Sequence, residues 1–503
     1  MQVVSKRLSF SLLAICAAMV LSTFIDDNLG WSWPTNVLRN WQEFGFFQLH
    51  GRMVYNPGGF DAIAHPQTYG GMSPVCLYPV LFVTEAFGWT GLGTLAFHIL
   101  LAIAVFWAIW RLAGQDNFAL IAAAATIMCP GYLRWPKGLD PNALSVLPVL
   151  PYAVFALALL KKPATIAVQV GLIILTLAFM SLNWTTAWVC GPCILFLVAV
   201  PGVNRRSLIT LIAVMVIAVP LVVLFSFAAK FGHSVEQAAS GGPLSILAGY
   251  TWGNSGYGEG QSAARLFLRI AFTNVVGLLP LWLIFICALA QRIRAGARLS
   301  WLIFAPLALA VADLVIMRNY FGHHPWMAGP VLVVGVIFSL GAIRNTLPVD
   351  AQELPGKLPL KVVYATALLA FLYGLAVLSF FRANEAQILT LIKLVREHTP
   401  RSDSIVILKT DLETVRVSSR LDEPLDRHIL VVDSVNDLAN PHQSIILTSI
   451  KLDQAGPLIA RTSAKSASWL SKVADWFNRS ISHRRSGDRL ELADTYYLYA
   501  SGQ

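Results

Sequence analysis

Long runs of apolar residues, separated by short polar turns, fill most of the chain up to about Arg382. A helix needs roughly 20 consecutive apolar residues to cross the hydrocarbon core of a bilayer. By this measure the pattern predicts about eleven membrane-spanning helices. Their predicted starts lie near Leu8, Trp89, Phe118, Asn142, Ala164, Trp184, Leu208, Leu266, Leu299, Met327 and Lys361. The pattern therefore predicts a polytopic α-helical membrane protein.

Beyond Arg382 the pattern is that of a soluble domain. AQILTLIKLVREH and ASWLSKVADWF are typical of helices, whereas SIVILKT, HILVVDS and SIILTSI are typical of buried strands. We therefore expect a transmembrane domain over residues 1–381 and a small α/β domain over residues 382–503. The transmembrane domain contains two long polar loops, at 26–88 and 230–265.

Composition agrees with a membrane protein, because 56% of the residues are hydrophobic and only 13% are charged. A soluble domain carries about 25% charged residues. The formal net charge of +10 does not indicate nucleic-acid binding. Much of this charge lies in short turns between the predicted spans, where basic residues set the orientation in the membrane.

The basic clusters in these turns predict the topology. If the count of spans is right, all of them fall on one side, which is the cytoplasm by the positive-inside rule. The clusters are Lys6-Arg7, Lys161-Lys162, Arg205-Arg206, Arg292 with Arg294 and Arg298, and Arg344. We therefore expect both long loops and the C-terminal domain outside the cytoplasmic (inner) membrane. The first span has no cleavage site of the small-residue type, so we expect it to be retained.

Asp26 and Asp27 directly follow the first predicted span. Carboxylates at the mouth of a membrane helix are costly and usually functional. The loop that follows is rich in aromatic residues, which indicates helices lying in the membrane interface or a simple aromatic belt. These residues are Trp31, Trp33, Trp41, Phe44, Phe46 and Phe47. The second loop contains the glycine-rich stretch YTWGNSGYGEGQ, which is typical of a mobile lid.

Several cationic residues fall on the predicted outer side, against the positive-inside preference. They are Arg134, Lys137, Arg265, Arg269 and, in the turn RNYFGHHPW, Arg318, His323 and His324. Each of Arg134, Lys137, Arg265 and Arg269 alone is explained at least as well by snorkelling to lipid phosphates, whereas the cluster of Arg318, His323 and His324 favours phosphate contact. Together they indicate an outer pocket for an anionic group. Asp313, one or two turns before Arg318, is a candidate partner for it.

Two other motifs carry alternative chemistry. CGPC, from Cys190 to Cys193, has the spacing of a redox pair, but it lies in an apolar span rather than a βαβ context. Gly191-Pro192 is better interpreted as a helix kink. His323 and His324, with His65, His50 and the acidic pair, could hold a divalent cation, although a metal site needs three or four converging ligands.

The order of these features resembles the GT-C superfamily of lipid-phosphosugar-dependent glycosyltransferases. Protein O-mannosyltransferases and lipid A aminoarabinose transferases are the nearer relatives by this resemblance. It extends from the N-terminus to about Asn345 and rests on the acidic pair and four short pieces. These pieces are HGRMVYNPGG, MSPVCLYPVLFVTEAFGWTGLG, Tyr132–Ser145 and RNYFGHHPWMAGPVL. The aminoarabinose branch has Glu-Lys before the loop proline, whereas this chain has Met72-Ser73.

The resemblance implies a polyprenyl-phosphate sugar as donor and an inverting transfer to an acceptor glycan, lipid or protein. It implies that Asp26 is the general base and that Asp27 orients it, binds the acceptor or holds a cation. No cofactor is implied beyond that divalent cation, and membrane lipids are the other expected partners. We expect the donor phosphate or sugar to contact His65, Tyr69, Arg134, Lys137, Arg265, Arg269, Arg318, Tyr320, His323 and His324.

Two other classes of protein remain open at this stage. A transporter or flippase for a lipid-linked saccharide would also need many spans and an anion pocket. Such proteins often show internal inverted repeats, and none is evident in this sequence. A membrane scaffold with a binding domain would leave the acidic pair and the outer arginines unexplained. The CGPC motif leaves a thiol enzyme as a further alternative.

Overall fold

The computed structural model divides the chain into two compact units. The helical unit comprises Met1–Leu29 and Gly70–Val377, and the mixed unit comprises Gly30–Tyr69 and Leu378–Gln503. The residues that the structure describes are 16–21, 33–59, 62–67, 73–87, 91–134, 141–231, 263–317, 328–347, 359–383, 386–412, 414, 427–434, 444–452, 457–463 and 495–500. The grouping of the first loop with the C-terminal residues is not evident from the hydrophobic pattern.

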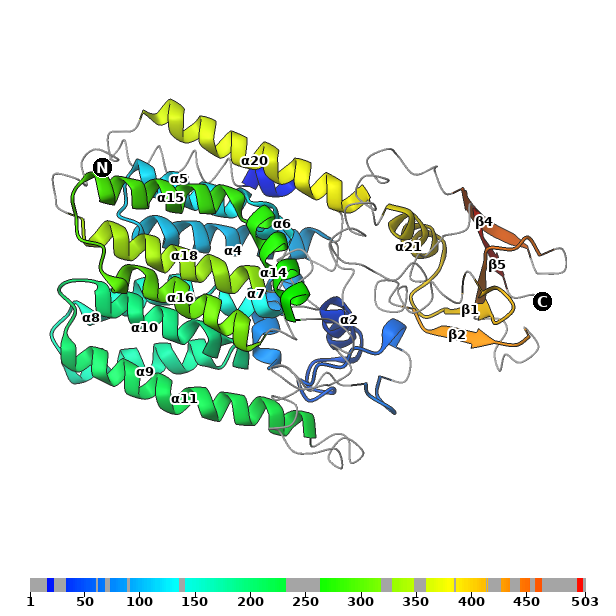
Figure 1. Cartoon of the computed structure of the whole chain (residues 1–503). Coiled ribbons are helices and arrows are strands. Elements are labelled where there is room, and N and C mark those ends of the chain that lie inside the picture. Colours follow the sequence, from blue (N-terminus) through cyan, green and yellow to red (C-terminus); the bar gives the residue numbers. More distant parts are fainter. Residues whose placement is uncertain are drawn as a thin grey trace. The chain divides into compact units, whose positions relative to one another are not determined.

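The helical unit is a bundle of apolar helices (Figure 1). Its described elements are η2 (Pro74–Leu77), α3 (Tyr78–Phe87), α4 (Gly91–Leu112), α5 (Asn117–Met128), α6 (Pro130–Arg134), α7 (Pro141–Val146), α8 (Val149–Leu160), α9 (Ile166–Met180), η3 (Trp184–Thr186), α10 (Ala187–Ala199), α11 (Arg205–Phe231), α14 (Ala263–Gly277), α15 (Leu279–Arg294), α16 (Trp301–Ile316), α18 (Ala328–Asn345) and, up to Val377, α20 (Leu360–Ala383). Residues 16–21 are also helical. A helix thus occupies the described part of every predicted span.

Five helices of the described residues are long and apolar enough to cross a membrane. They are Gly93–Leu112, Ala143–Leu160, Arg205–Val222, Ala328–Asn345 and Lys361–Ser379. Two bent pairs raise the number to seven if each pair is one span: α9 with η3 and α10, bent by 118°, and α14 with α15, bent by 79°. These helices are typical of a membrane-embedded protein, whereas eleven separate spans stay a prediction.

Helix α18 lies at the centre of the helical unit. Nearly all of its residues are buried, and it packs against α16, α10, α15 and α4. Glycines allow the close approach, because a Cβ at Gly335 would lie 2.6 Å from the Cβ of Ala310. Phe338 stacks on Phe196 of α10, with 5.0 Å between ring centroids. The positions of α10 and α16 are therefore fixed by contact with α18.

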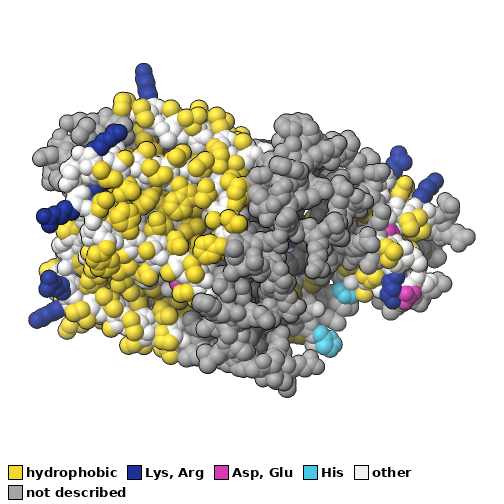
Figure 2. Space-filling model, in the orientation of Figure 1, with side chains coloured by type: hydrophobic (Ala, Val, Ile, Leu, Met, Phe, Trp, Pro, Cys, Tyr) yellow, Lys and Arg dark blue, Asp and Glu magenta, His cyan; other side chains and the backbone are white. Residues whose placement is uncertain are grey.

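The basic turns of the helical unit meet at one end, the basic end. The N–H of Asn204 donates to the carbonyl of Leu160 at 2.8 Å, which joins the turn before α11 to the end of α8. Arg292 Nη1 donates to the carbonyl of Ile343 at 3.2 Å, which joins the end of α15 to that of α18. Arg344 lines a cavity together with residues at the end of α8. Figure 2 shows Lys and Arg side chains gathered at one end of this unit, beside a broad hydrophobic belt.

These contacts bring together every basic cluster of the sequence argument except Lys6-Arg7, which lies outside the described residues. The clusters therefore share one end of the bundle. The side of the membrane that this end faces stays a prediction, as does the retained first span.

In the mixed unit, helix α2 (Trp33–Phe44) is joined to the segment after it by buried polar contacts. Asn40 Nδ2 donates to the carbonyls of Val54 and Asn56 at 2.9 and 3.1 Å, and Trp41 Nε1 donates to that of Arg52 at 2.7 Å. Trp41 is only 2% exposed. This tryptophan is therefore a core residue of the mixed unit, and a membrane-interface position for α2 stays a prediction.

The C-terminal part of the mixed unit is an α/β sheet with strand order β2-β1-β3-β5-β4. The strands are β1 (Ser404–Leu408), β2 (Ile429–Val432), β3 (Ser444–Thr448), β4 (Leu458–Ser463) and β5 (Thr495–Ala500). β1 is parallel to β2 and β3, whereas β5 is antiparallel to β3 and β4. The apolar side of α21 (Ala386–His398) packs on one face of this sheet. The three predicted strands and the first predicted helix are confirmed, but the predicted burial of HILVVDS is wrong, because β2 is an edge strand whose residues are partly exposed. ASWLSKVADWF lies outside the described residues.

Candidate functional site

Most of the predicted site residues lie outside the part of the chain that the structure describes. These are Asp26, Asp27, Tyr69, Lys137, Arg318, Tyr320, His323 and His324. Of the others, the structure describes the side chain of His65 and the backbone alone of Arg134, Arg265 and Arg269. The structure therefore describes the elements that carry or flank these residues, and the site itself stays a prediction.

The elements that carry the three arginines meet. Arg134 is the last residue of α6, and Arg265 and Arg269 lie in the first two turns of α14. α6 packs against α14, and α14 packs against α18. Figure 1 shows α6 and α14 side by side at one end of the helical unit. The backbone of α6 and α14 thus brings these three positions into one region, and a shared anion pocket stays a prediction.

This region lies at the end of the bundle opposite the basic end. Helices α8, α15 and α18 all finish at the basic end, so α7, α14 and the start of α18 lie at the other. α5 begins beside the basic end, so α6, which follows it, also lies at the other. The arginines of α6 and α14 are thus separated by the length of the bundle from the basic turns.

The helices on either side of RNYFGHHPW, a sequence that lies outside the described residues, pack against each other. α16 ends at Ile316, α18 begins at Ala328, and the two helices are in extensive contact. Asp313 lies one turn before the end of α16 and is partly buried. Among the described residues it has no ion-pair partner, and Arg318, its predicted partner, lies outside them. A carboxylate in an apolar helix at this point is a further acidic group of the candidate site.

A polar node fixes the start of η2 at the same end. Ser73 Oγ donates to the carbonyl of Ser181 at 3.1 Å, and the Ser73 N–H donates to Asn183 Oδ1 at 3.4 Å. Ser145 of α7 and Thr185 share a hydrogen bond of 2.6 Å between their hydroxyls. η2 and α3 form a continuous helical segment that begins at Pro74, directly after Ser73, and ends at Phe87. The node holds that helix against the bend between α9 and α10.

Two buried polar groups at this end were missed by sequence reasoning. The hydroxyl of Tyr132 in α6 and the amide Nδ2 of Asn183 are buried and have no hydrogen-bond partner among the described residues. An unsatisfied buried polar group costs free energy and calls for a structural or functional reason. A single tyrosine or asparagine beside an apolar run gives no signal of this in the sequence, because burial depends on distant helices.

His65 belongs to the mixed unit, and its side chain is exposed. Its carbonyl accepts a hydrogen bond from Asn56 Nδ2 at 3.2 Å, which fixes the backbone at this point. Its part in phosphate binding stays a prediction.

The alternative chemistries gain no support from the described residues. Cys190 and Cys193 are buried free thiols within α10, and the thiol of Cys190 donates to the carbonyl of Thr186 at 3.3 Å. Within the described ranges there is no group of three or more His, Cys, Asp or Glu side chains that could hold a metal ion. The histidine pair and the acidic pair lie outside those ranges, so the divalent cation stays a prediction.

A scan against protein-family models finds no match for the chain, and no curated protein matches it.

Proposed function

We propose that the protein is a membrane glycosyltransferase that moves a sugar from a polyprenyl-phosphate donor to an acceptor. The observation that carries the proposal is the meeting of α6 and α14, which bear Arg134, Arg265 and Arg269, opposite the basic end. Basic residues at the basic end serve orientation. Orientation in the membrane does not account for arginines at the opposite end. An anionic head group does, because burying a phosphate without neighbouring cations costs a prohibitive amount of free energy.

In this proposal Asp26 takes the proton from the acceptor hydroxyl. The acceptor oxygen then attacks the anomeric carbon of the donor sugar, and the bond from that carbon to the phosphate oxygen breaks. The polyprenyl phosphate leaves with the bonding electron pair, and the single displacement inverts the anomeric carbon. The cationic side chains stabilise the charge that grows on the leaving phosphate. General-base catalysis contributes roughly 10²- to 10⁴-fold to the rate.

The proposal includes the orientation of the protein in the membrane. The basic end faces the cytoplasm, and the apolar helices shorter than a full span complete about eleven crossings of the cytoplasmic membrane. The acidic pair, the opposite end of the bundle and the C-terminal domain then lie outside the cytoplasm.

The test is transfer by the purified full-length protein with a set of polyprenyl-phosphate sugars, followed by mass detection of released polyprenyl phosphate. We expect Asp26→Asn to lower turnover by at least about 100-fold, because an amide cannot act as a general base. Asp26→Glu should retain part of the activity, since it keeps a carboxylate. Glu397→Gln is the matched control, because Glu397 is an exposed residue of α21 and its removal leaves the site intact.

Near-normal turnover by a folded Asp26→Asn protein would contradict the role of Asp26. If wild-type protein releases no lipid phosphate from any donor but moves a lipid-linked saccharide across liposome membranes, the protein is a transporter and the proposal is wrong.

A further inference from the structure

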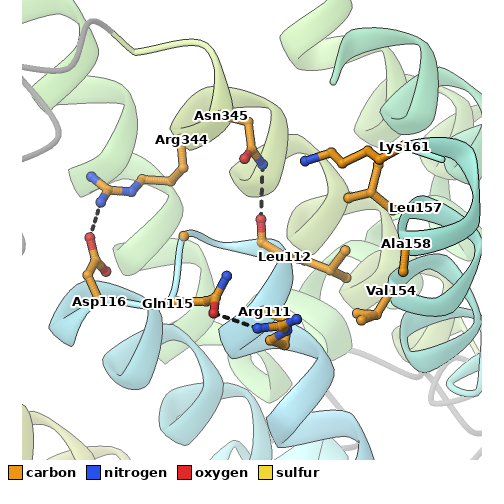
Figure 3. A pocket seen from close by; sticks show the side chains of 11 residues that line it. Arg111, Leu112, Gln115, Asp116, Val154, Leu157, Ala158, Lys161, Arg344 and Asn345 are labelled. Carbon is orange, nitrogen blue, oxygen red and sulfur yellow. Dashed lines mark hydrogen bonds and ion pairs between the residues drawn. The ribbon is translucent and has the colours of Figure 1, made fainter. Parts of the chain in front are cut away.

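A cavity of about 480 Å³ opens at the basic end of the helical unit. It lies among the ends of three helices and the tight turn between α4 and α5 (Figure 3). Its described lining residues are Arg111, Leu112, Gly114, Gln115, Asp116, Val154, Leu157, Ala158, Lys161, Arg344 and Asn345. It lies at the opposite end of the bundle from the candidate glycosyl-transfer site.

The charges that line the cavity do not cancel. Arg344 forms an ion pair with Asp116, the sole acidic residue among the described lining residues. Arg111 Nη1 donates to Gln115 Oε1 at 2.6 Å, and this neutral partner leaves its positive charge in place. The ammonium of Lys161 has no carboxylate partner in this lining and points across the cavity in Figure 3. Two positive charges therefore remain for an anion to balance.

The wall around these cations is rigid. Asp116 caps α5 by accepting from the N–H of Ala119 at 2.8 Å, while its other oxygen holds Arg344. Asn345 Nδ2 donates to the carbonyl of Leu112 at 3.1 Å, which locks the end of α18 to that of α4. An anion would therefore enter a site whose wall beside the cations is already ordered, which lowers the ordering free energy lost on binding.

The residues of α8 before Lys161 give the cavity an apolar side. Val154, Leu157 and Ala158 of α8 line it, and Phe155, on the same helix, is 53% exposed, as a lipid-facing side chain of a membrane helix would be. A cavity that places two unbalanced cations, Arg111 and Lys161, next to the apolar residues of α8 fits an amphiphilic anion. Basic pockets between membrane helices on the cytoplasmic side are known to hold lipid head groups.

We infer that this cavity binds the phosphate group of an anionic membrane lipid, with Arg111 and Lys161 as the charged contacts. A free phosphate ester would bind the same cations but would make no contact with the apolar residues of α8. A phospholipid of the surrounding leaflet would place its phosphate beside the cations and its acyl chains along α8.

The test is lipid binding to the purified full-length protein, measured by native mass spectrometry during titration with phosphatidylglycerol or phosphatidylcholine. We expect phosphatidylglycerol to bind more tightly, and Lys161→Ala and Arg111→Ala each to weaken that binding about fivefold, since each basic residue near an anionic lipid surface contributes about 1 kcal/mol. Lys161→Arg should bind like wild type. Lys162→Ala is the matched control, because it removes the neighbouring exposed charge, which does not line the cavity.

Inorganic phosphate and glycerol phosphate, added as competitors, distinguish the two sources of the anion. Failure of either to displace phosphatidylglycerol at millimolar concentration supports a lipid site, whereas binding of either as tight as that of the lipid overturns it. Equal loss of affinity in Lys162→Ala and Lys161→Ala, or equal binding of both lipids, would also overturn the inference. These outcomes do not depend on glycosyl transfer, so the two proposals can fail separately.

Discussion

Among single residues, Asp411 shows how one buried carboxylate holds several segments together. It lies just after β1 and is only 2% exposed. Its two oxygens accept hydrogen bonds from the hydroxyls and backbone N–H groups of Thr414 and Ser449 and from the hydroxyl of Thr448, at 2.6 to 3.1 Å. Burial raises the pKa of Asp411, but these hydrogen bonds outweigh burial and hold it below the usual value. The ionised carboxylate thus links the end of β1 to the end of β3.

We therefore expect Asp411→Asn to destabilise the C-terminal domain by about 3 kcal/mol, because it leaves buried donors without a charged acceptor. Pulse proteolysis of the full-length protein at increasing urea concentration measures this change. Asp433→Asn is the control, since its ion pair with Lys409 is exposed on both sides and should contribute less than about 1 kcal/mol. Equal urea resistance of wild type and Asp411→Asn would contradict this role.

The lowered pKa of Asp411 also predicts how the stability of the C-terminal domain changes with pH. Because the folded-state pKa is below the unfolded value of about 3.9, the stabilisation is complete above that value and is lost as the pH falls through the folded pKa. The wild-type domain should therefore lose stability more steeply than Asp411→Asn on acidification below about pH 4. Pulse proteolysis of both proteins at stepped pH, with an acid-stable protease, measures the difference; parallel pH profiles would show that Asp411 does not titrate in this way.

At this scale the sequence predicted candidate residues but not their surroundings. Asp26, Arg265 and Arg318 stand out because charge is uncommon next to apolar runs. The Ser73–Asn183 node does not stand out, because its partners are 110 positions apart and neither residue type is unusual in a turn. Such contacts are set by which helices pack together, and hydrophobic periodicity carries no information on that choice.

At the scale of elements, the hydrophobic pattern located the helices but not their breaks. A single span was expected from Leu266, whereas the structure has α14 and α15 with a bend of 79° between them. Pro280 explains the break at Leu278, because Pro280 has no backbone N–H to continue the hydrogen bonds of α14 and its ring would clash with the preceding turn. The run of apolar residues on both sides concealed this signal. The bend matters, since it sets the direction in which α14 carries Arg265 and Arg269.

The close packing of α18 against α16 predicts that an added methyl group between them lowers the stability of the protein. A methyl group at Gly335 would overlap Ala310 and press on the backbone of α16, so we expect Gly335→Ala to lower the thermal stability of the protein, at a cost of about 1–3 kcal/mol. Gly171→Ala is a matched control in α9, where the added methyl meets only a side-chain methyl of Leu159 at 3.7 Å. That control should be neutral or slightly stabilising, because alanine is the better helix former. The measurement is the loss of monodisperse protein on heating in detergent; equal behaviour of the two variants would contradict tight α16–α18 packing.

At the scale of the whole molecule, the compact units do not follow the order of segments along the chain. The segment Gly30–Tyr69 follows the first predicted span, yet it belongs to the same unit as the C-terminal domain. Arg401 explains the association: its guanidinium pairs with Glu43 and donates to Asn40 Oδ1 at 2.6 Å. The sequence contains these residues but no signal that pairs them, because they lie 361 positions apart. The predicted division into a transmembrane domain (1–381) and a C-terminal domain (382–503) therefore concerns which residues enter the membrane. It stays a prediction and does not describe how the compact units are packed.

This association predicts the behaviour of a cleaved chain. If a protease site is inserted between α20 and α21 of the full-length protein and cut, the C-terminal fragment should stay bound, because it is held by the segment between Gly30 and Tyr69. Gly58 adds to the contact, since a Cβ there would lie 2.8 Å from the carbonyl oxygen of Arg401. Co-elution of the two fragments in size-exclusion chromatography measures the association. Arg401→Ala combined with Gly58→Val should release the fragment, whereas Lys409→Ala, which removes only an exposed ion pair, should not. Release of the unmutated fragment on cleavage would show that the two segments do not form one unit.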